Sequence, residues 1–153
     1  MKTSVFAIDV GYGNTKYAHR AASGTIATGM FPSLAPLAAS HALSGYGDSV
    51  LAARKVATIV IEQIEYEVGP DVSLTAAYGK TGRALSNDFV LSDNYDALLF
   101  GAIHFAGVTQ IERLVLGLPV HNMKKYSGAL RDRFTGTFDY GLSRISIDKV
   151  VVI

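Results

Sequence analysis

An acid, two glycines and a lysine follow one another closely at the end of the first apolar run of the chain. Residues 6–17 read FAIDVGYGNTKY. A carboxylate such as Asp9 at the end of a buried strand is poorly solvated unless backbone amides or a hydrated cation accompany it. Gly11 and Gly13 permit positive φ angles and let a ligand approach the backbone, whose amides can then point inward around an anion. With the charge of Lys16, these groups suit a phosphate chain with Mg²⁺.

The same segment can also be interpreted as an ordinary hairpin turn. Gly-x-Gly is common in hairpins, and Asn14, which with Thr15 adds hydrogen-bond donors, also favours turns. The segment is not a dinucleotide-binding fingerprint, because the third glycine is absent, and it is not a P-loop. On residue chemistry alone, phosphate binding and a plain turn both remain open.

Other residues with reactive or ligating side chains lack the neighbours that a site requires. Gly79-Lys80-Thr81 looks like the end of a P-loop, but the first glycine of that motif would fall on Leu74. Ser127 has no matching His and Asp, so hydrolase chemistry is unsupported. The histidines show no metal-ligand spacing: they are His19, His41, His104 and His121.

Composition and charge describe a globular chain without a strong electrostatic preference. Of the 153 residues, 49% are hydrophobic, so a core can form. The formal net charge of +1 gives no case for direct binding to nucleic acid or to an anionic membrane. No apolar run approaches the roughly 20 residues that span a bilayer. The absence of cysteine excludes disulfides and thiolate sites. We expect a cytoplasmic protein.

The elements that would position the glycine-rich segment alternate between strands and helices. Strands are expected at 4–9, 14–20, 25–31, 58–68, 111–118 and once or twice within 138–153. Helices are expected at 93–106, with an apolar stripe on one face, and at 123–134. Ser92 or Asp93 can cap the first helix and Gly107 can end it. This order predicts an α/β domain in which a meander of three strands forms part of a mixed sheet.

The chain ends on an apolar strand, Val150-Val151-Val152-Ile153. An exposed apolar strand at a terminus invites aggregation, so such a strand is expected to pair in a sheet or to pack under further chain. We expect the 153 residues to be the N-terminal piece of a longer protein, the alternative being a last strand buried in a complete small domain.

Several segments, in order along the chain, resemble actin-like proteins of the plasmid-segregation type (ParM or StbA) in the actin, Hsp70 and sugar-kinase superfamily. The motifs are Ile8–Lys16 (IDVGYGNTK), Phe31-Pro32-Ser33, Tyr66–Gly69 (YEVG), Asp93–Leu99 (DNYDALL) and Leu114–Val120 (LVLGLPV). Each motif is weak by itself, and the first and last together are moderately specific. The resemblance covers nearly all of the chain.

The resemblance implies an RNase-H-like domain with a mixed sheet and a small inserted lobe. The core would comprise residues 1–31 and 88–153, and the inserted lobe about 32–87. The C-terminal half of the nucleotide site would be absent from this segment, so the fragment alone would be inactive while the complete protein would be an ATPase.

The resemblance also implies the roles of the site residues. Asp9 would hold Mg²⁺ through water, and Lys16 would neutralise phosphate charge. The amides of the residues between them would contact the β- and γ-phosphates of ATP or GTP: Gly11, Tyr12, Gly13, Asn14 and Thr15. Nucleotide binding would favour self-assembly into filaments that segregate plasmid DNA, with a DNA-bound adaptor protein as a further partner.

Two other functions remain open at this point. A small-molecule kinase of the same superfamily would need a substrate carboxylate in the cleft, and a non-catalytic interaction module would use residues 6–17 only as a hairpin. Two surfaces are also open to two interpretations. The basic helix with Lys124, Lys125, Arg131 and Arg133 and the hairpin with Glu62, Glu65 and Glu67 are either solvated faces or contacts to other subunits or to an adaptor.

Overall fold

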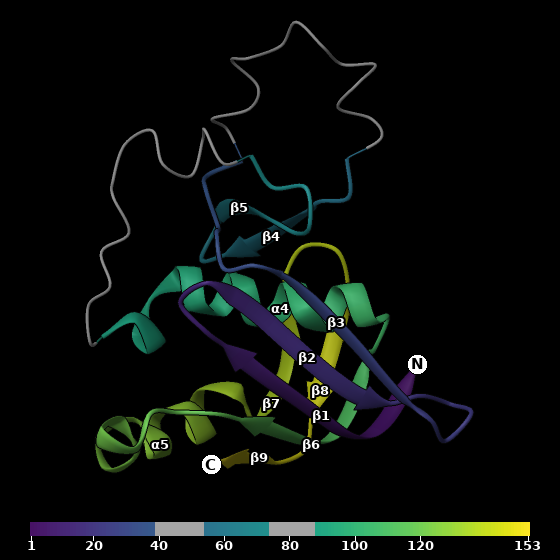
Figure 1. Cartoon of the computed structure of the whole chain (residues 1–153), viewed down its shortest axis with the longest axis vertical. Coiled ribbons are helices and arrows are strands. Elements are labelled where there is room, and N and C mark those ends of the chain that lie inside the picture. The colour runs from purple at the N-terminus through teal and green to yellow at the C-terminus, as the bar shows by residue number, and fades with distance from the viewer. Residues whose placement is uncertain (39–53, 74–87) are drawn as a thin grey trace, which may run out of the picture.

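The computed structural model describes residues 1–38, 54–73 and 88–153 (Figure 1). The three predicted opening strands are present as β1 (Lys2–Val10), β2 (Asn14–Arg20) and β3 (Ile26–Pro32). The other strands of the large sheet are β6 (Gln110–Leu116), β7 (Gly136–Asp139), β8 (Arg144–Ile147) and β9 (Val150–Val152). The helical elements are η1 (Phe89–Leu91), α4 (Asp93–Ala106) and α5 (Val120–Phe134).

The large sheet is mixed, as predicted. Its order is β3-β2-β1-β6-β8-β7. Strand β9 also pairs with β6, at residues 114–116, whereas β8 pairs with β6 at residues 110 and 111. The three opening strands are antiparallel to one another, whereas β1 and β6 run parallel, as do β6 and β9. The apolar end of the chain therefore pairs with β6 in this sheet, with Val150 and Val152 buried and Ile153 exposed.

The core lies on one face of this sheet. In register, Phe6 faces His19 and Ile8 faces Tyr17, and parallel to them lie Leu114 and Leu116 of β6. Phe100 of α4 packs against Phe134 of α5 with ring centroids 5.9 Å apart, so both helices share one apolar layer. Burial of this layer supplies the main stabilisation of the fold.

Local signals set the bounds of α4 at the predicted residues 93 and 106. The Ser92 side chain accepts a hydrogen bond from the Tyr95 amide at 3.2 Å, which caps the first turn. Gly107 adopts the left-handed conformation, with φ of 68°, that terminates many helices.

Burial of this helix extends beyond the apolar stripe that the sequence predicts. All residues from 95 to 103 of α4 are buried, because the helix lies between the large sheet and a second, two-stranded sheet (Figure 1). That second sheet is the hairpin β4 (Ala57–Ile61) and β5 (Ile64–Val68). A helix covered on two sides needs no polar face.

Close packing of the hairpin on α4 depends on Gly101. A Cβ at this position would lie 2.5 Å from Val68 Cγ2. We expect Gly101→Ala to destabilise the domain by about 1–3 kcal/mol despite the better helix propensity of alanine. Gly128→Ala in α5 is the matched control, since its Cβ would meet nothing within 4 Å, and should leave stability equal or raised by up to about 1 kcal/mol. Urea denaturation measures both; equal midpoints would contradict the packing argument.

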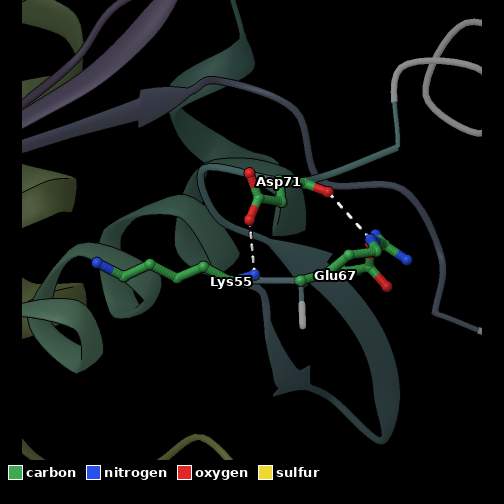
Figure 2. A network of polar contacts seen from close by, with 4 residues as sticks. Lys55, Glu67 and Asp71 are labelled. Atoms are coloured by element: carbon green, nitrogen blue, oxygen red, sulfur yellow. Dashed lines mark hydrogen bonds and ion pairs between the residues drawn. The ribbon is translucent and has the colours of Figure 1, made fainter. Parts of the chain in front are cut away.

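The expectation that all three glutamates of the hairpin lie on a solvated face is wrong for one of them. Glu62 and Glu65 are exposed, whereas Glu67 is 6% exposed and forms an ion pair with Arg54. Arg54 Nε also donates to the Asp71 carbonyl at 3.2 Å, and the Lys55 amide donates to the Asp71 carboxylate at 2.7 Å (Figure 2). This network ties the segment before β4 to the segment after β5.

Candidate functional site

The glycine-rich loop and the Gly-Leu-Pro corner meet at one edge of the large sheet. Parallel pairing of β1 and β6 brings the ends of both strands to this edge, with Ile8 opposite Leu116. The Gly117 amide donates to the Ile8 carbonyl at 3.4 Å. A Cβ on Gly117 would lie 3.9 Å from Asp9 Oδ1. The two most informative motifs of the sequence, more than a hundred residues apart, thus form one site.

Asp9 and Lys16 occupy facing positions on β1 and β2. Both are exposed, and neither has an ion pair or side-chain hydrogen bond with any residue that the structure describes. They line one end of a hollow of 570 Å³ that lies over the sheet face opposite α4. The expectation that the Asp9 carboxylate is poorly solvated is therefore wrong, because the strand end opens directly to solvent.

Not all of the backbone amides that were expected to contact phosphate are available, because the hairpin itself uses some of the hydrogen-bonding groups. The Gly11 amide donates to the Asn14 carbonyl at 3.1 Å, and the Gly13 carbonyl accepts from the Ser33 amide at 3.0 Å. The amides of Tyr12 and Gly13 make no hydrogen bond within the described parts of the chain. These two N–H groups, rather than that of Gly11, are available to an anion.

The predicted reason for the two glycines needs correction. Neither Gly11 nor Gly13 has a positive φ. A Cβ on Gly11 would lie 3.0 Å from the Asn14 carbonyl oxygen, so a larger residue would crowd this turn. A Cβ on Gly13 would meet nothing within 4 Å, so the protein itself does not require glycine there. The open space beside Gly13 is the kind of position at which a ligand can approach the backbone.

The side chains of the loop point in different directions. Thr15 is completely buried, and its hydroxyl pairs with the Ser33 hydroxyl at 2.9 Å, which holds β2 against the end of β3. The Thr15 hydroxyl therefore faces the interior and not the loop. Asn14 is exposed, and the Tyr12 ring, 48% exposed, lies 6.5 Å from the Phe89 ring. Sequence reasoning placed Ser33 next to the third strand without finding this contact.

Two buried titratable groups lie beneath the loop in α4. Burial raises the pKa of the Tyr95 phenol, and the negative charges of Asp96 and Asp9 add to that effect. Burial also raises the pKa of Asp96 to about 7, although its ion pair with Arg133 of α5 acts in the opposite direction. Arg133, which the sequence placed on a solvated or partner-binding face, is thus used within the protein.

The remaining predicted candidates do not converge on the loop. Lys125 lies 3.7 Å from Asp88 and over the Tyr126 ring, while Lys124 and Arg131 are exposed. His104 contacts the rings of Phe105 and Tyr140, and burial lowers the pKa of its imidazole. The P-loop-like residues 79–81 and His41 lie outside the described residues.

No carboxylate or imidazole cluster capable of enclosing a metal ion occurs in the described ranges. Among the described residues, Asp9 belongs to no such cluster. This arrangement fits Mg²⁺, which usually keeps several waters and binds through one or two carboxylates plus phosphate oxygens. In the same part of the chain, no helix is long and apolar enough to cross a membrane.

Comparison with known proteins identifies similar chains. The family model described as "Actin like proteins N terminal domain" matches residues 7–153. A search of curated protein sequences returned no significant match.

Three solved structures illustrate the likeness of fold. AlfA from the B. subtilis plasmid pLS32, solved as a filament, shares 20% identity and a TM-score of 0.64, with 98% of this chain and 55% of the AlfA chain covered. Alp7A, an actin-like protein, shares 18% identity and a TM-score of 0.64, covering 99% and 44%. ParM from Bacillus thuringiensis with AMPPNP shares 13% identity and a TM-score of 0.57, covering 99% and 45%. The chain thus spans about half the length of these proteins.

Proposed function

Because the chain belongs to the family of actin-like protein N-terminal domains, we propose that it forms one side of a nucleotide cleft in an ATPase that assembles into filaments for plasmid segregation. The other side of that cleft would come from a second domain outside these 153 residues, and residues 32–87 would form the inserted lobe of the first. The observation that carries the proposal is the meeting of the Asp9–Lys16 loop with the Gly117 corner at one open sheet edge.

The residues at this edge fit a nucleotide phosphate chain with Mg²⁺. The exposed Asp9 carboxylate would hold the hydrated ion, and the Lys16 ammonium would balance phosphate charge. The amides of Tyr12 and Gly13 would donate to phosphate oxygens, with Gly11 and Asn14 shaping the turn and Thr15 anchoring it through Ser33. When bound, Mg²⁺ would supply charge neutralisation during phosphoryl transfer to water.

Relatives of similar fold support the wider function. AlfA was solved as a filament, and ParM of Bacillus thuringiensis was solved with AMPPNP, ATP and ADP. We propose that this protein likewise binds ATP, or GTP, with self-assembly in the cytoplasm as the outcome. A DNA-bound adaptor would link such filaments to the plasmid, with no direct contact between this domain and DNA.

Gly13→Ala tests the amide cradle. The added Cβ would meet no atom of the described residues within 4 Å and needs no strained φ, so we expect the free energy of unfolding to be unchanged. In the complex the Cβ would occupy space that the phosphates need, so we expect nucleotide affinity to fall by about tenfold or more, which is about 1.4 kcal/mol. Isothermal titration of the complete protein with Mg-ATP measures this. Gly128→Ala, equally unhindered in α5, is the control, and unchanged affinity in Gly13→Ala would contradict the proposed approach of phosphate to this amide.

A further inference from the structure

Strand β3 forms one edge of the large sheet, and no described residue pairs with its outer side. It pairs only with β2 and lies at the margin of the sheet in Figure 1. The pairing is continuous over all seven residues, Ile26–Pro32, without a bulge. A long and regular edge strand presents a row of unpaired N–H and C=O groups, which are a template for pairing with another strand.

Two hydrogen bonds at the ends of the β2–β3 pairing show which residues of β3 face outward. The Ser33 amide donates to the Gly13 carbonyl at 3.0 Å, and the Ala21 amide donates to the Thr25 carbonyl at 2.8 Å. Both bonds join directly opposite residues that continue the register. In an antiparallel ladder, hydrogen-bonded pairs alternate with non-hydrogen-bonded pairs, so every second residue of β3 directs its N–H and C=O away from β2. These residues are Ile26, Thr28 and Met30.

The outward-facing backbone groups are free within the described parts of the chain. Neither the amides nor the carbonyls of these three residues form a hydrogen bond there. Their side chains are exposed as well, Ile26 to 63% and Met30 to 58%, with Thr28 between them. Pairing with a further strand would satisfy the backbone groups and would remove apolar surface from water, so both terms favour it.

The opposite edge of the same sheet is protected, in contrast to β3. Strand β7 at that edge has only four residues and ends in Asp139. Short edge strands and charged side chains are common means by which proteins prevent edge-to-edge pairing. Strand β3 has neither feature, because none of its residues, IATGMFP, carries a charge. Gly29 does not interrupt it, since the Tyr17 ring fills the space beside this glycine, 2.2 Å from where a Cβ would lie.

We propose that β3 pairs with β3 of a second copy of this chain, antiparallel and about a twofold axis at Thr28. In this register Thr28 lies opposite the partner's Thr28, and Ile26 lies opposite the partner's Met30. Each outward-facing residue then donates one hydrogen bond across the contact and accepts one. Apolar pairs and threonine pairs directly opposite each other are favourable cross-strand combinations.

The arrangement of side chains along the edge favours a second copy as the partner. The strand is self-complementary around Thr28, because a large apolar residue stands two positions before it and another two positions after it. No charged residue lies on β3, and the nearest cations on this face, Lys16 and Arg20, belong to β2. Two copies therefore meet without direct contact between like charges.

A twofold contact of this kind closes on itself as a dimer, whereas a filament grows by head-to-tail contacts. Pairing through β3 requires no nucleotide, so it does not depend on the function proposed above. In filaments of the proposed kind, the same contact would link two filaments rather than extend one, and this last step alone rests on the proposed function.

Sedimentation velocity of the complete protein, without nucleotide and with EDTA, tests the contact apart from filament assembly. We expect a monomer–dimer equilibrium with a Kd of about 100 µM or lower. Thr28→Lys places two ammonium groups opposite each other on the twofold axis, so it should weaken the dimer about tenfold or more. Thr137→Lys, the same exchange at an exposed position of β7, is the matched control and should leave the Kd unchanged. A protein that remains monomeric at about 0.5 mM, or an unchanged Kd in Thr28→Lys, would overturn the proposal.

Paired substitutions at Ile26 and Met30 test the register. Ile26→Glu combined with Met30→Lys places opposite charges across the contact and should keep the Kd within about threefold of the unsubstituted protein. Ile26→Glu combined with Met30→Glu places like charges there and should weaken the dimer about tenfold or more. Folding should be retained in the second variant, because the new carboxylates lie beside Arg20 and Lys16 of β2. Equal dimerisation of the two double variants would contradict the proposed pairing.

Amide hydrogen exchange distinguishes pairing through this edge from a dimer formed by another surface. Raising the protein concentration should slow exchange at the amides of Ile26, Thr28 and Met30. The amides of Ala27 and Gly29 should be protected at every concentration, because they are bonded to β2 in the monomer. A dimer that forms without this alternating protection would place the interface elsewhere and would refute the proposal.

Discussion

Replacing Asp9 with alanine is expected to abolish nucleotide-dependent assembly of the complete protein. Asp9 is the exposed carboxylate at the edge where the glycine-rich loop meets the Gly117 corner, and it forms no ion pair with the described residues that the substitution would remove. Removal of an outer-sphere partner of a bound metal ion typically costs about 10–100-fold in metal affinity or activity. We expect a loss of that size in Mg-ATP affinity and no rise in light scattering when nucleotide is added.

The same substitution should leave the fold intact. Substitution of an exposed side chain away from such interactions usually changes the free energy of unfolding by less than about 0.5 kcal/mol. The urea midpoint of Asp9→Ala should therefore match that of the unsubstituted protein. Asp9→Asn tests the charge separately, because it keeps the shape of the side chain and should lose most of the affinity as well. Asp148→Ala, which removes another exposed carboxylate away from the loop, is the control. Assembly that proceeds unchanged in Asp9→Ala would rule out the proposed role of this residue.

Replacing Arg133 with alanine should give the largest loss of stability. Arg133 of α5 pairs with Asp96 of α4, and the Asp96 side chain is only 8% exposed, with its Oδ1 unpartnered. Removing one partner of a buried ion pair typically costs about 3–5 kcal/mol, because Asp96 must then either stay charged without its cation or take up a proton. Urea denaturation at pH 8 should show a decrease of this order, whereas Arg131→Ala, an exposed change on the same helix, should stay within about 0.5 kcal/mol.

The deficit of Arg133→Ala should shrink in acid, because the pKa of Asp96 is raised to about 7, chiefly by burial. A carboxyl with a raised folded-state pKa stabilises the fold below its unfolded pKa of 3.8 and loses that contribution as the pH rises through about 7. At pH 5.5 Asp96 is largely protonated in the folded protein, so the loss of the Arg133 charge costs less stability. Without Arg133 the pKa of Asp96 rises further, because the ion pair is what lowers it. Asp96→Asn added to Arg133→Ala should restore stability at pH 8; a deficit independent of pH would show that Arg133 acts through packing instead.

Elements with local signals were predicted well. The strand from Asn14 to Arg20 and the helix from Asp93 to Ala106 have the predicted bounds. The reason is that a turn, a serine cap and a glycine after the last turn act on their immediate neighbours. The mixed sheet was predicted from the order of the strands and helices, and the family likeness from the order of the motifs; both are confirmed. The last segment, expected to hold one or two strands, contains three, because β8 and β9 pair with different parts of β6.

Features that depend on contacts between distant residues were missed or predicted wrongly. Glu67 is buried because Arg54, thirteen positions earlier, neutralises it. Helix α4 lacks a polar face because β5 packs on the side of the helix that lies outside the predicted apolar stripe. The absence of a side chain at Gly101 allows this close packing. The turn between β4 and β5 holds Glu62 and Gln63 at positive φ, although neither residue favours that conformation.

The sequence by itself determined which groups stand at the loop: a carboxylate, two glycines and a lysine in a spacing that suits phosphate. Only the tertiary structure decided which of them are available. Asp9 and Lys16 face solvent, the amide of Gly11 is used within the turn, and the hydroxyl of Thr15 is turned into the interior by Ser33. The space beside the loop, lined also by Tyr95 of α4 and by Asn122 of α5, likewise exists only because segments far apart in the sequence pack around it. Residue type specifies the chemistry that a position can offer, whereas burial and hydrogen bonding to distant residues decide whether that chemistry is free for a ligand.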